Sequence, residues 1–561
     1  MELLYPIDNE FRHSIPLDGS WYFAFDENQI GWEAGIPKRT VVNVPADIQD
    51  SFIKPTERSF SGTMWYERTM FIPKEWLGET VYLHFEGVGR RAEIYVNGSV
   101  AGRHEGVFIP FAIDITRQIR YGEENKIVIQ ISNGITPYDL PTGHVRVGAD
   151  GRKVNVNHSD YPVPTGLYAS VHLCTVPQNR ITDVDYHIEK VTPEEAVIHY
   201  MVKIKGNCLV TAILRDREGR VVATSVGGNG RLLIHTPHLW DIGDGYLYRL
   251  DFDVSRLGKH HDTYSLPIGI RTIEIDNQTW CINGKQVILR GVRVDGRHVD
   301  AMTASPIMAR RELIRLLELG GNCIFSGGYT LPEYIITLAD QMGLLVIDEI
   351  SAAGMGIKNV ADFDDKGSYY SQADVKIRVM QSHLNIVKAI MNRDKNHSSV
   401  IGWSLFYEPG ILVDDDERYF NEVYAYAKTL DRQYRPLGMT VNLSVNDICK
   451  SCIAYNNFLI ISQWVHGEFA GPEALADDLS QGLHEWQEQY PTMPLIVRLA
   501  EYNHRDVKNY FSVAERIDIN EQYLLQAYEV LEQRHNVVGE LMDSLQITHP
   551  AIIRRRWKHT I

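Results

Sequence analysis

The chain has 561 residues, of which 44% are hydrophobic and 23% charged, and its formal net charge is −16 at pH 7. This length predicts about three domains, and the composition is that of an ordinary soluble globular protein. The negative charge excludes a nucleic-acid partner, because phosphate binding requires clustered lysines and arginines. No apolar run is long enough to predict a membrane span.

The N-terminal residues and the cysteines bear on location and cofactors. Met1 to Asp8 lack a basic segment followed by an apolar core, which predicts a cytoplasmic protein. Only Cys449 and Cys452 form a CxxC pair. Zinc normally requires four ligands and no second pair lies at a suitable spacing, so we predict no metal site. Nothing matches a nucleotide-binding loop, so we predict no cofactor.

Residues 1–178 carry a pattern of short strands joined by turns. Apolar and more polar residues alternate from Val81 to Glu86, which is the period of a strand with one buried face. The run from Ala92 to Val96 enters Asn97-Gly98, a strong hairpin signal. These features predict an antiparallel β-sandwich.

Residues 179–270 form a second β-rich block. Strands are predicted over Val197–Ile204, Leu209–Arg215, Val221–Ser225 and Tyr246–Val254. This spacing is typical of an immunoglobulin-like sandwich. The block contains no convergent cluster of polar residues. We therefore expect it to have a geometric role, positioning the neighbouring domains.

Residues 271–561 alternate strands with helices. The predicted strands and amphipathic helices include Val287–Gly291, Met308–Leu319, Leu331–Met342, Gly343–Glu349 and Glu417–Leu430. Parallel strands that alternate with helices over this length predict a (β/α)₈ TIM barrel.

A short apolar run, Val400–Phe406, supplies the first catalytic candidate. The run is too short for a helix and predicts a buried strand. Pro409 cannot donate a hydrogen bond to a neighbouring strand, so the strand must end there with Glu408 at its C-terminal tip. The C-terminal tips of barrel strands carry the catalytic groups. The alternative is that Glu408 caps the next helix.

A second run, Pro494–Ala500, has the same construction and ends at Glu501. Two carboxylates on different strand tips are what retaining glycoside hydrolysis requires. One protonates the leaving oxygen while the other attacks the anomeric carbon, with the two about 5 Å apart. The sequence permits this separation without establishing it.

These motifs resemble family 2 of the glycoside hydrolases, most closely its β-glucuronidase branch. Arg393–His397, followed by Glu408-Pro409, resembles the acid/base signature of that family, and Pro494–Tyr502 resembles its nucleophile strand. Leu17–Trp21 resembles the sugar-binding jelly roll that opens these enzymes. The resemblance implies a jelly roll, an immunoglobulin-like domain and a barrel, with Glu408 as acid/base and Glu501 as nucleophile. It also implies a homo-oligomer.

The resemblance assigns two loop residues near the pocket. Asp160 occupies a position similar to a family aspartate that reaches into the barrel, and the alternative is a solvated loop aspartate. His298 follows the first barrel strand and either orients neighbouring groups or is a structural loop histidine. The carboxylates at other strand ends, Asp348, Glu349 and Glu540, are expected to have structural roles beneath or beside the pocket.

A further segment, Gln463–Phe469, contains the candidate substrate-binding residues Trp464 and His466. Val465 stands where the family usually has a tyrosine that touches the nucleophile. His466 or Tyr502 could take the place of that tyrosine.

Several positions depart from the family pattern. Tyr407 replaces an asparagine that holds the 2-hydroxyl of the sugar, and Phe325 and Gly328 replace an arginine and a histidine of the pocket. Asp543 replaces a tryptophan, and Trp557–His559 stands at the place of the pair that binds the uronate carboxylate. We therefore expect Tyr407 and Phe325 to line a pocket more aromatic than that of a uronidase.

The leading hypothesis is a retaining exo-β-glycosidase that cleaves a small-molecule glycoside or oligosaccharide other than a plain glucuronide. One alternative is a pseudo-glycosidase that binds a carbohydrate or a glycoside-like ligand without hydrolysis. Another is non-hydrolytic acid/base chemistry on the same scaffold. Fold alone does not choose among them.

Overall fold

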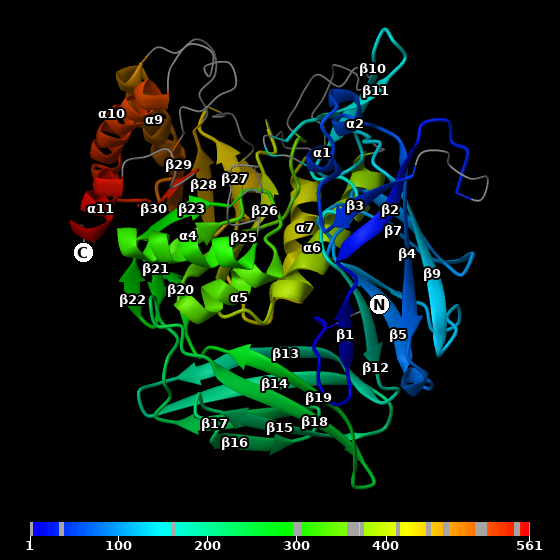
Figure 1. Ribbon diagram of the computed structural model, residues 1–561. Helices are drawn as coiled ribbons and strands as arrows, with labels where there is room; N and C mark the ends of the chain where they lie inside the picture. The colour runs from blue at the N-terminus through cyan, green and yellow to red at the C-terminus, as the bar shows by residue number, and fades with distance from the viewer. Residues whose placement is uncertain are drawn as a thin grey trace.

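The computed structural model describes residues 4–32, 39–159, 161, 163–294, 305–355, 370, 375–410, 416–444, 450–463, 471–499, 513–543 and 550–559. These residues form two β-sandwiches and a closed barrel of parallel strands. Figure 1 shows the first sandwich beside the barrel and the second sandwich beneath both.

The first sandwich contains a four-stranded sheet in the order β1-β12-β5-β8 and a six-stranded sheet in the order β3-β2-β4-β9-β6-β7. Strands β10 and β11 form a separate hairpin. The elements are β1 (His13–Pro16), β2 (Gly19–Asp26), β3 (Thr40–Val44), α1 (Ile48–Ser51), α2 (Pro55–Arg58), β4 (Thr63–Ile72), the short turn η1 (Lys74–Trp76), β5 (Thr80–Phe85), β6 (Arg91–Val96), β7 (Ser99–Glu105), β8 (Phe111–Asp114), β9 (Glu123–Ser132), β10 (Gly143–Val147), β11 (Lys153–Asn157) and β12 (Val171–Val176).

Strand β5 differs from the expectation of one buried face, because all six of its residues are buried. Val81, Leu83 and Phe85 join the core between the two sheets. Tyr82, on the other face, packs with Cys174 in a smaller cluster. The alternation was therefore real, but the prediction of a solvated face was wrong because that face is covered as well. The hairpin predicted after β6 is confirmed by the pairing of β6 with β7.

The second sandwich pairs a three-stranded sheet, in the order β13-β14-β17, with a four-stranded sheet in the order β16-β15-β18-β19. Its elements are β13 (Arg180–Val191), β14 (Glu195–Lys205), β15 (Leu209–Arg215), β16 (Val221–Val226), β17 (Asn229–His235), β18 (Tyr248–Arg256) and β19 (Lys259–Ile268). Apolar residues from both sheets share one core.

The third part begins with the small sheet β20-β21-β22 and continues as a barrel closed in the order β23 to β30. The elements are β20 (Ile273–Asp276), β21 (Thr279–Ile282), β22 (Lys285–Val287), β23 (Leu289–Arg293), α4 (Pro306–Leu319), β24 (Cys323–Phe325), α5 (Glu333–Met342), β25 (Leu345–Glu349), the π-helical turn η3 (Val375–Val379), α6 (Met380–Asp394), β26 (Val400–Tyr407), α7 (Glu417–Leu430), β27 (Leu437–Asn442), α8 (Lys450–Ile453), β28 (Phe458–Ser462), α9 (Pro472–Gln489), β29 (Leu495–Leu499), α10 (Val513–Glu532), β30 (Val537–Met542) and α11 (Pro550–His559).

Alternate residues of the barrel strands belong to two different cores. Cys323 and Phe325 of β24 join a cluster in the barrel interior, whereas Ile324 packs in the layer between the strands and the helices. This alternation of faces decides which residues can reach the barrel mouth. In the part of the chain that the structure describes, no helix combines the length and the apolar character that a membrane crossing requires.

A buried ion pair joins the N-terminal segment to the second sandwich. The Arg12 guanidinium contacts both oxygens of Asp262, at 2.8 and 2.6 Å, and also donates to the Ile181 carbonyl. The Ile181 amide donates to Asp262 as well. Arg12 and Asp262 are 4% and 0% exposed.

We expect Asp262→Ala to lower the unfolding temperature clearly. Removal of one partner leaves Arg12 buried without its counter-charge, which costs about 3–5 kcal/mol. Differential scanning calorimetry measures the change. Glu195→Ala is the matched control, because Glu195 pairs with Lys190 at the surface and exposed pairs contribute little. An equal shift in both variants would contradict the prediction.

Candidate active site

Strand β26 places Glu408 at the mouth of the barrel. All eight residues of β26 are buried, as the apolar run predicted. Glu408 follows directly with a φ of 47°, and its amide donates to the Thr440 carbonyl on the neighbouring strand β27 at 2.8 Å. Its side chain is only half-buried. Left-handed backbone is uncommon outside glycine and clusters at active sites.

Tyr407 lies beside Glu408 with its ring enclosed on several sides. Its hydroxyl accepts a hydrogen bond from Arg498 Nη1 at 2.9 Å. The Arg293 guanidinium lies 5.5 Å from the ring centroid, and Tyr161 of the first sandwich meets the ring edge-on at 5.9 Å. The ring is 2% exposed. The ring is therefore covered by protein on most of its surface, and its role in lining a substrate pocket stays a prediction.

Arg498 and Asp543 form a buried ion pair at the same end of the barrel. Arg498 Nε and Nη2 donate to the two Asp543 oxygens at 2.6 and 3.0 Å, and Nη1 also donates to Ser462 Oγ at 2.9 Å. Arg293 Nη1 lies 3.9 Å from Asp543. Burial and the charge of Arg293 act to lower the pKa of Arg498, but Asp543 and Tyr407 outweigh them and hold it above its ordinary value.

Sequence reasoning missed the two arginines of this cluster. Both are nearly fully buried, and each sits within an apolar strand, in Leu289-Arg-Gly-Val-Arg293 and Leu495-Ile-Val-Arg498. A charge in a buried strand must be paired, and period-2 alternation from the interior residues Leu289 and Ile496 assigns both arginines to the inward face. An arginine on the inward face of an apolar strand was therefore the sequence signal that could have identified both residues.

Glu349 ends strand β25 in a fully buried position next to this cluster. Its Oε1 accepts hydrogen bonds from Ser404 Oγ and Thr440 Oγ1, both at 2.5 Å. Burial raises the pKa of Glu349 to about 8, against the opposing effect of those two hydroxyls and of Arg293 and Arg498. Glu349 is therefore mostly neutral at pH 7. Thr440 connects it to the backbone that holds Glu408.

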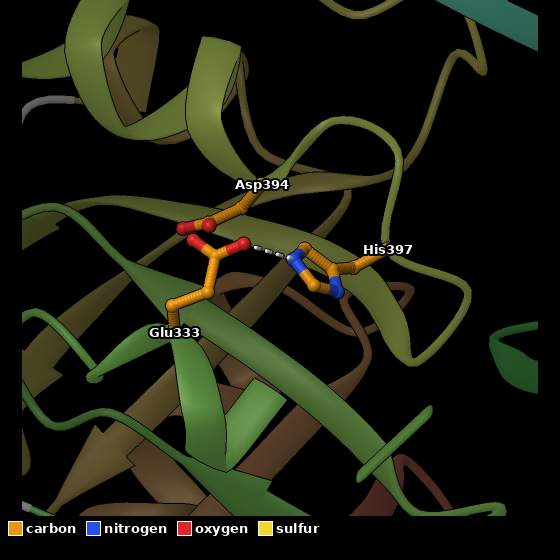
Figure 2. A group of neighbouring side chains, drawn as sticks. All are labelled: Glu333, Asp394 and His397. Atoms are coloured by element: carbon orange, nitrogen blue, oxygen red, sulfur yellow. Dashed lines mark ion pairs between the residues drawn. The ribbon is translucent and has the colours of Figure 1, made fainter. Parts of the chain in front are cut away.

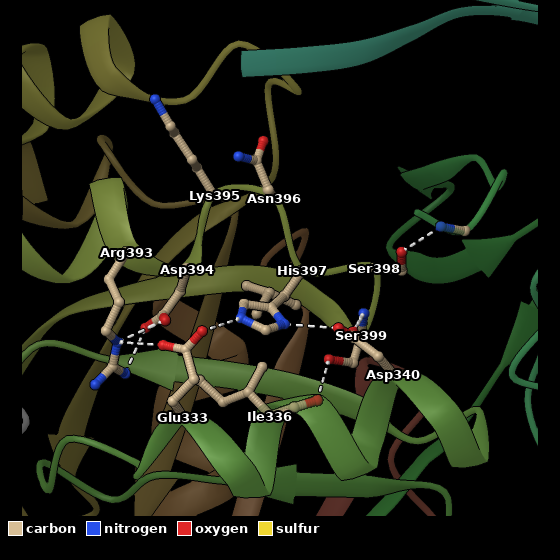
Figure 3. A network of polar contacts seen from close by, with 12 residues as sticks. Glu333, Ile336, Asp340, Arg393, Asp394, Lys395, Asn396, His397, Ser398 and Ser399 are labelled. Atoms are coloured by element: carbon tan, nitrogen blue, oxygen red, sulfur yellow. Dashed lines mark hydrogen bonds and ion pairs between the residues drawn. The ribbon is translucent and has the colours of Figure 1, made fainter. Parts of the chain in front are cut away.

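The turn that precedes β26 is fixed by ion pairs (Figures 2 and 3). His397 Nδ1 lies 2.6 Å from Asp340, and Nε2 lies 3.4 Å from Glu333. Arg393 binds both oxygens of Asp394 at 2.6 Å. Burial alone would lower the pKa of His397, but Asp340 and Glu333 raise it well above its ordinary value. The ring is therefore an imidazolium.

Glu333, Asp394 and His397 lie close enough together to suggest a metal site, since their ligand atoms are within 4.8 Å of one another. A histidine ligand must be neutral, whereas His397 is held in its charged form by the neighbouring carboxylates. Arg393 supplies the second positive charge. The group is thus an ion-pair network that orients the start of β26.

Several predicted site residues lie outside the described residues: Asp160, His298, Trp464, His466, Glu501 and Tyr502. Strand β29 ends at Leu499, so Glu501 is close in sequence to the strand tip. Phe325 is fully buried in the interior cluster and has no exposed surface. Its assignment to the substrate pocket stays a prediction that this packing does not support.

Glu349 makes the stability of the folded chain depend on pH. Its pKa rises from 4.5 to about 8 on folding, so the folded state binds more protons than the unfolded state between these values. The free energy of unfolding therefore falls as pH rises through this window. We expect Glu349→Gln to flatten the fall in melting temperature over this window. Glu422→Gln, an exposed control on α7, should follow the unmodified chain, and a parallel fall for both variants would contradict the assignment.

Comparisons with known proteins agree with this architecture. Three family models match in succession: the glycosyl hydrolases family 2 sugar binding domain at residues 15–177, glycosyl hydrolases family 2 at residues 174–271, and the family 2 TIM barrel domain at residues 273–544. The β-glucuronidase of Sus scrofa is 28% identical over 585 residues, covering 96% of this chain and 86% of that protein.

Two solved structures cover almost the whole chain. The β-glucuronidase of Ruminococcus gnavus, in complex with uronic deoxynojirimycin, has a TM-score of 0.87 and 28% identity, with 99% of each chain covered. The β-glucuronidase of Lactobacillus rhamnosus has a TM-score of 0.89 and 27% identity, covering 100% of this chain and 99% of that one. The chain therefore belongs to family 2 of the glycosyl hydrolases and is, as a member, a glycoside hydrolase acting on O-glycosyl bonds.

Proposed function

We propose that this chain is a retaining exo-β-glycosidase with Glu408 as general acid/base and Glu501 as nucleophile. In the first step Glu501 attacks the anomeric carbon while Glu408 protonates the leaving oxygen. In the second step Glu408 deprotonates a water that releases the sugar from Glu501. The observation that carries the proposal is the position of Glu408, half-buried at the mouth of a closed barrel with its backbone held by Thr440.

The substrate that we propose is a β-glycoside other than a plain glucuronide. The relatives are named β-glucuronidases, whose substrate carries a carboxylate. Here the Asp543 carboxylate pairs with Arg498, which also donates hydrogen bonds to Tyr407 and Ser462. Tyr407 presents its hydroxyl to Arg498, where the family amide would bind the 2-hydroxyl of the sugar. These contacts favour a neutral or larger sugar. A homo-oligomer, expected from the resemblance, is part of the proposal.

The same contacts favour one alternative. If Tyr407, Arg498 and Asp543 keep these contacts when a ligand is bound, the hydrogen bond that strengthens in the transition state is lost, and that bond contributes several kcal/mol. The chain would then be a pseudo-glycosidase that binds carbohydrate without cleaving it. The turnover of single variants separates the two functions.

The first experiment measures kcat/KM on aryl β-glucoside, β-galactoside, β-galacturonide and β-glucuronide for four forms of the protein. We expect one sugar to be hydrolysed and Glu408→Gln and Glu501→Gln each to lose at least about 100-fold, because general acid/base catalysis contributes about 10²–10⁴. Glu422→Gln, on the exposed face of α7, should retain full activity.

Proton NMR of the first product should show the β-anomer, since double displacement retains configuration. Unchanged turnover in either site variant would refute the assigned roles. Absence of turnover on all four sugars, with saccharide binding retained, would establish the pseudo-glycosidase instead.

A second prediction concerns the sugar. Asp543→Asn removes the counter-charge of Arg498 and leaves a positive group at the mouth. We expect the ratio of kcat/KM for glucuronide to that for glucoside to rise by about tenfold or more, because a hydrogen bond to a charged group contributes about 1.5–3 kcal/mol. Asp477→Asn, exposed on α9, is the control. An unchanged ratio in Asp543→Asn would show that this pair does not set specificity.

A further inference from the structure

The hairpin of β10 and β11 carries two histidines on one face. The two strands pair antiparallel, with His144 opposite Val156 and Gly143 opposite Asn157. His158 follows β11 directly, two residues beyond Val156. Because side chains alternate between the two faces of a strand, His158 lies on the same face as His144 and is its diagonal neighbour. Figure 1 shows the hairpin projecting at the top of the first sandwich.

The two imidazole rings direct one nitrogen each toward the same point. His144 Nδ1 and His158 Nε2 lie 3.1 Å apart. At this separation at least one of the two nitrogens carries no proton, because a hydrogen bond between imidazoles needs one donor and one acceptor. Both side chains are half-buried, so solvent and small ions reach the pair.

Thr142 determines which nitrogen of His158 carries the proton. The Thr142 hydroxyl donates to the Gly354 carbonyl at 2.7 Å and lies 3.2 Å from His158 Nδ1. A hydroxyl has a single proton to donate, so toward His158 it can only accept. His158 Nδ1 therefore carries the proton, and the lone pair of His158 Nε2 is the one that faces His144.

The base of the hairpin is packed against the barrel, which fixes the position of the pair. The Thr142 amide donates to the Ala353 carbonyl at 3.0 Å, and the His158 amide donates to the Thr142 carbonyl at the same distance. Thr142 is 1% exposed. A Cβ at Gly354 would lie 2.5 Å from Thr142 Oγ1 and 2.8 Å from His158 Cβ, so only a glycine fits against this face. The histidines are thus held in place before any ligand arrives.

Such a pair has the chemistry of a metal site. Neutral imidazole nitrogens suit Zn²⁺, Cu²⁺ and Ni²⁺, and a histidine ligand commonly donates its other ring N–H to an oxygen, as His158 does to Thr142. With metal–nitrogen bonds of about 2.0–2.1 Å, nitrogens 3.1 Å apart subtend about 100° at the metal, between the square-planar and tetrahedral angles.

The surroundings of the pair differ from those of His397. Among the described residues, no ion pair holds either histidine in its charged form, and no carboxylate or thiolate stands close enough to be a third ligand. An ion bound by the two rings therefore keeps its remaining positions open to water.

We propose that His144 Nδ1 and His158 Nε2 bind a divalent ion of the zinc, copper and nickel group, with Thr142 as a positioning residue. Without the ion, His144 Nδ1 donates its proton to His158 Nε2. When the ion binds, the proton of His144 moves through solvent to Nε2 of the same ring, so both imidazoles stay neutral. The site lies at the boundary between the first sandwich and the barrel, and the inference is independent of the chemistry proposed for Glu408 and Glu501.

The test titrates full-length protein with Zn²⁺ by isothermal calorimetry at micromolar concentration. We expect the unmodified chain to bind one Zn²⁺ ion more than either His144→Gln or His158→Gln. Electron paramagnetic resonance with less than one equivalent of Cu²⁺ gives an independent count of ligands. The unmodified chain should show coupling to two ring nitrogens, and each of the two variants should lose this signal.

Two substitutions at Thr142 test its positioning role. Thr142→Val removes the acceptor of the His158 proton and should weaken Zn²⁺ binding about tenfold or more, as loss of a group that orients a ligand does. Thr142→Ser keeps the hydroxyl and should bind like the unmodified chain. The melting temperature of each variant verifies folding, and an equal loss in both variants would overturn the role of the hydroxyl.

Two histidines elsewhere serve as controls. His260→Gln is exposed on β19, and His187→Gln alters a ring that lies 4.8 Å from the ring of His199 on the second sandwich. Both should bind Zn²⁺ like the unmodified chain. Absence of Zn²⁺ binding by the unmodified chain would overturn the proposal. So would binding that His144→Gln and His158→Gln retain in full, or that His187→Gln loses instead, because the ion would then occupy adventitious surface histidines or the other pair.

Discussion

The position of strand β26 depends on the charged imidazole of His397. It lies between Asp340 and Glu333, both on α5, and it belongs to the turn that joins α6 to β26. The amide of Ser399 also donates to Asp340, at 2.7 Å. The start of β26 is therefore held to a neighbouring helix by charge as well as by packing. All eight residues of β26 between this turn and Glu408 are buried, so the ion pairs hold the start of the strand while the Thr440 carbonyl holds its end.

Such a network is expensive to bury. The free-energy cost of removing several charges from water is offset only when each charge has partners in good geometry. A hydrophobic replacement of the network is often equally stable. What the network adds is a single position for the strand, since the fixed donors and acceptors fit one register. The Arg498–Asp543 pair does the same at the barrel mouth, where it fixes the hydroxyl of Tyr407. The ion pairs at both ends of the barrel thus fix the positions of the strands and side chains more than they add to the free energy of unfolding.

Much of the architecture could be predicted because local sequence signals agreed with the global fold. The run Val400–Phe406 stopped by Pro409 predicted β26, and the periodic residues of Glu417–Leu430 predicted α7 with the bounds that the structure shows. The meeting of Arg293, Arg498 and Asp543 could not be predicted in this way. Arg498 lies on β29 and Asp543 directly follows β30, and these consecutive strands pair directly. Arg293, on the first barrel strand, reaches them only because β30 pairs with β23 to close the barrel.

Burial explains the other differences. Family correspondence assigned Phe325 to the pocket, but strand alternation turns its ring into the interior core with Ile347 and Ile460. A motif gives the position of a residue in a strand. The exposure of its side chain depends on how tightly the side chains of the neighbouring elements pack around it. The roles of Glu501, Tyr502, Trp464 and His466 stay predictions, because they lie outside the described residues.

The edge-on contact of Tyr161 with Tyr407 makes the first sandwich part of the wall around the C-terminal end of β26. The barrel alone is therefore not the smallest autonomous unit of this protein, since its excision would leave Tyr407 without a covering ring. A change of either ring therefore alters the surface on which the other packs, although the two rings come from different domains. The shape of the barrel mouth is thus set jointly by two domains.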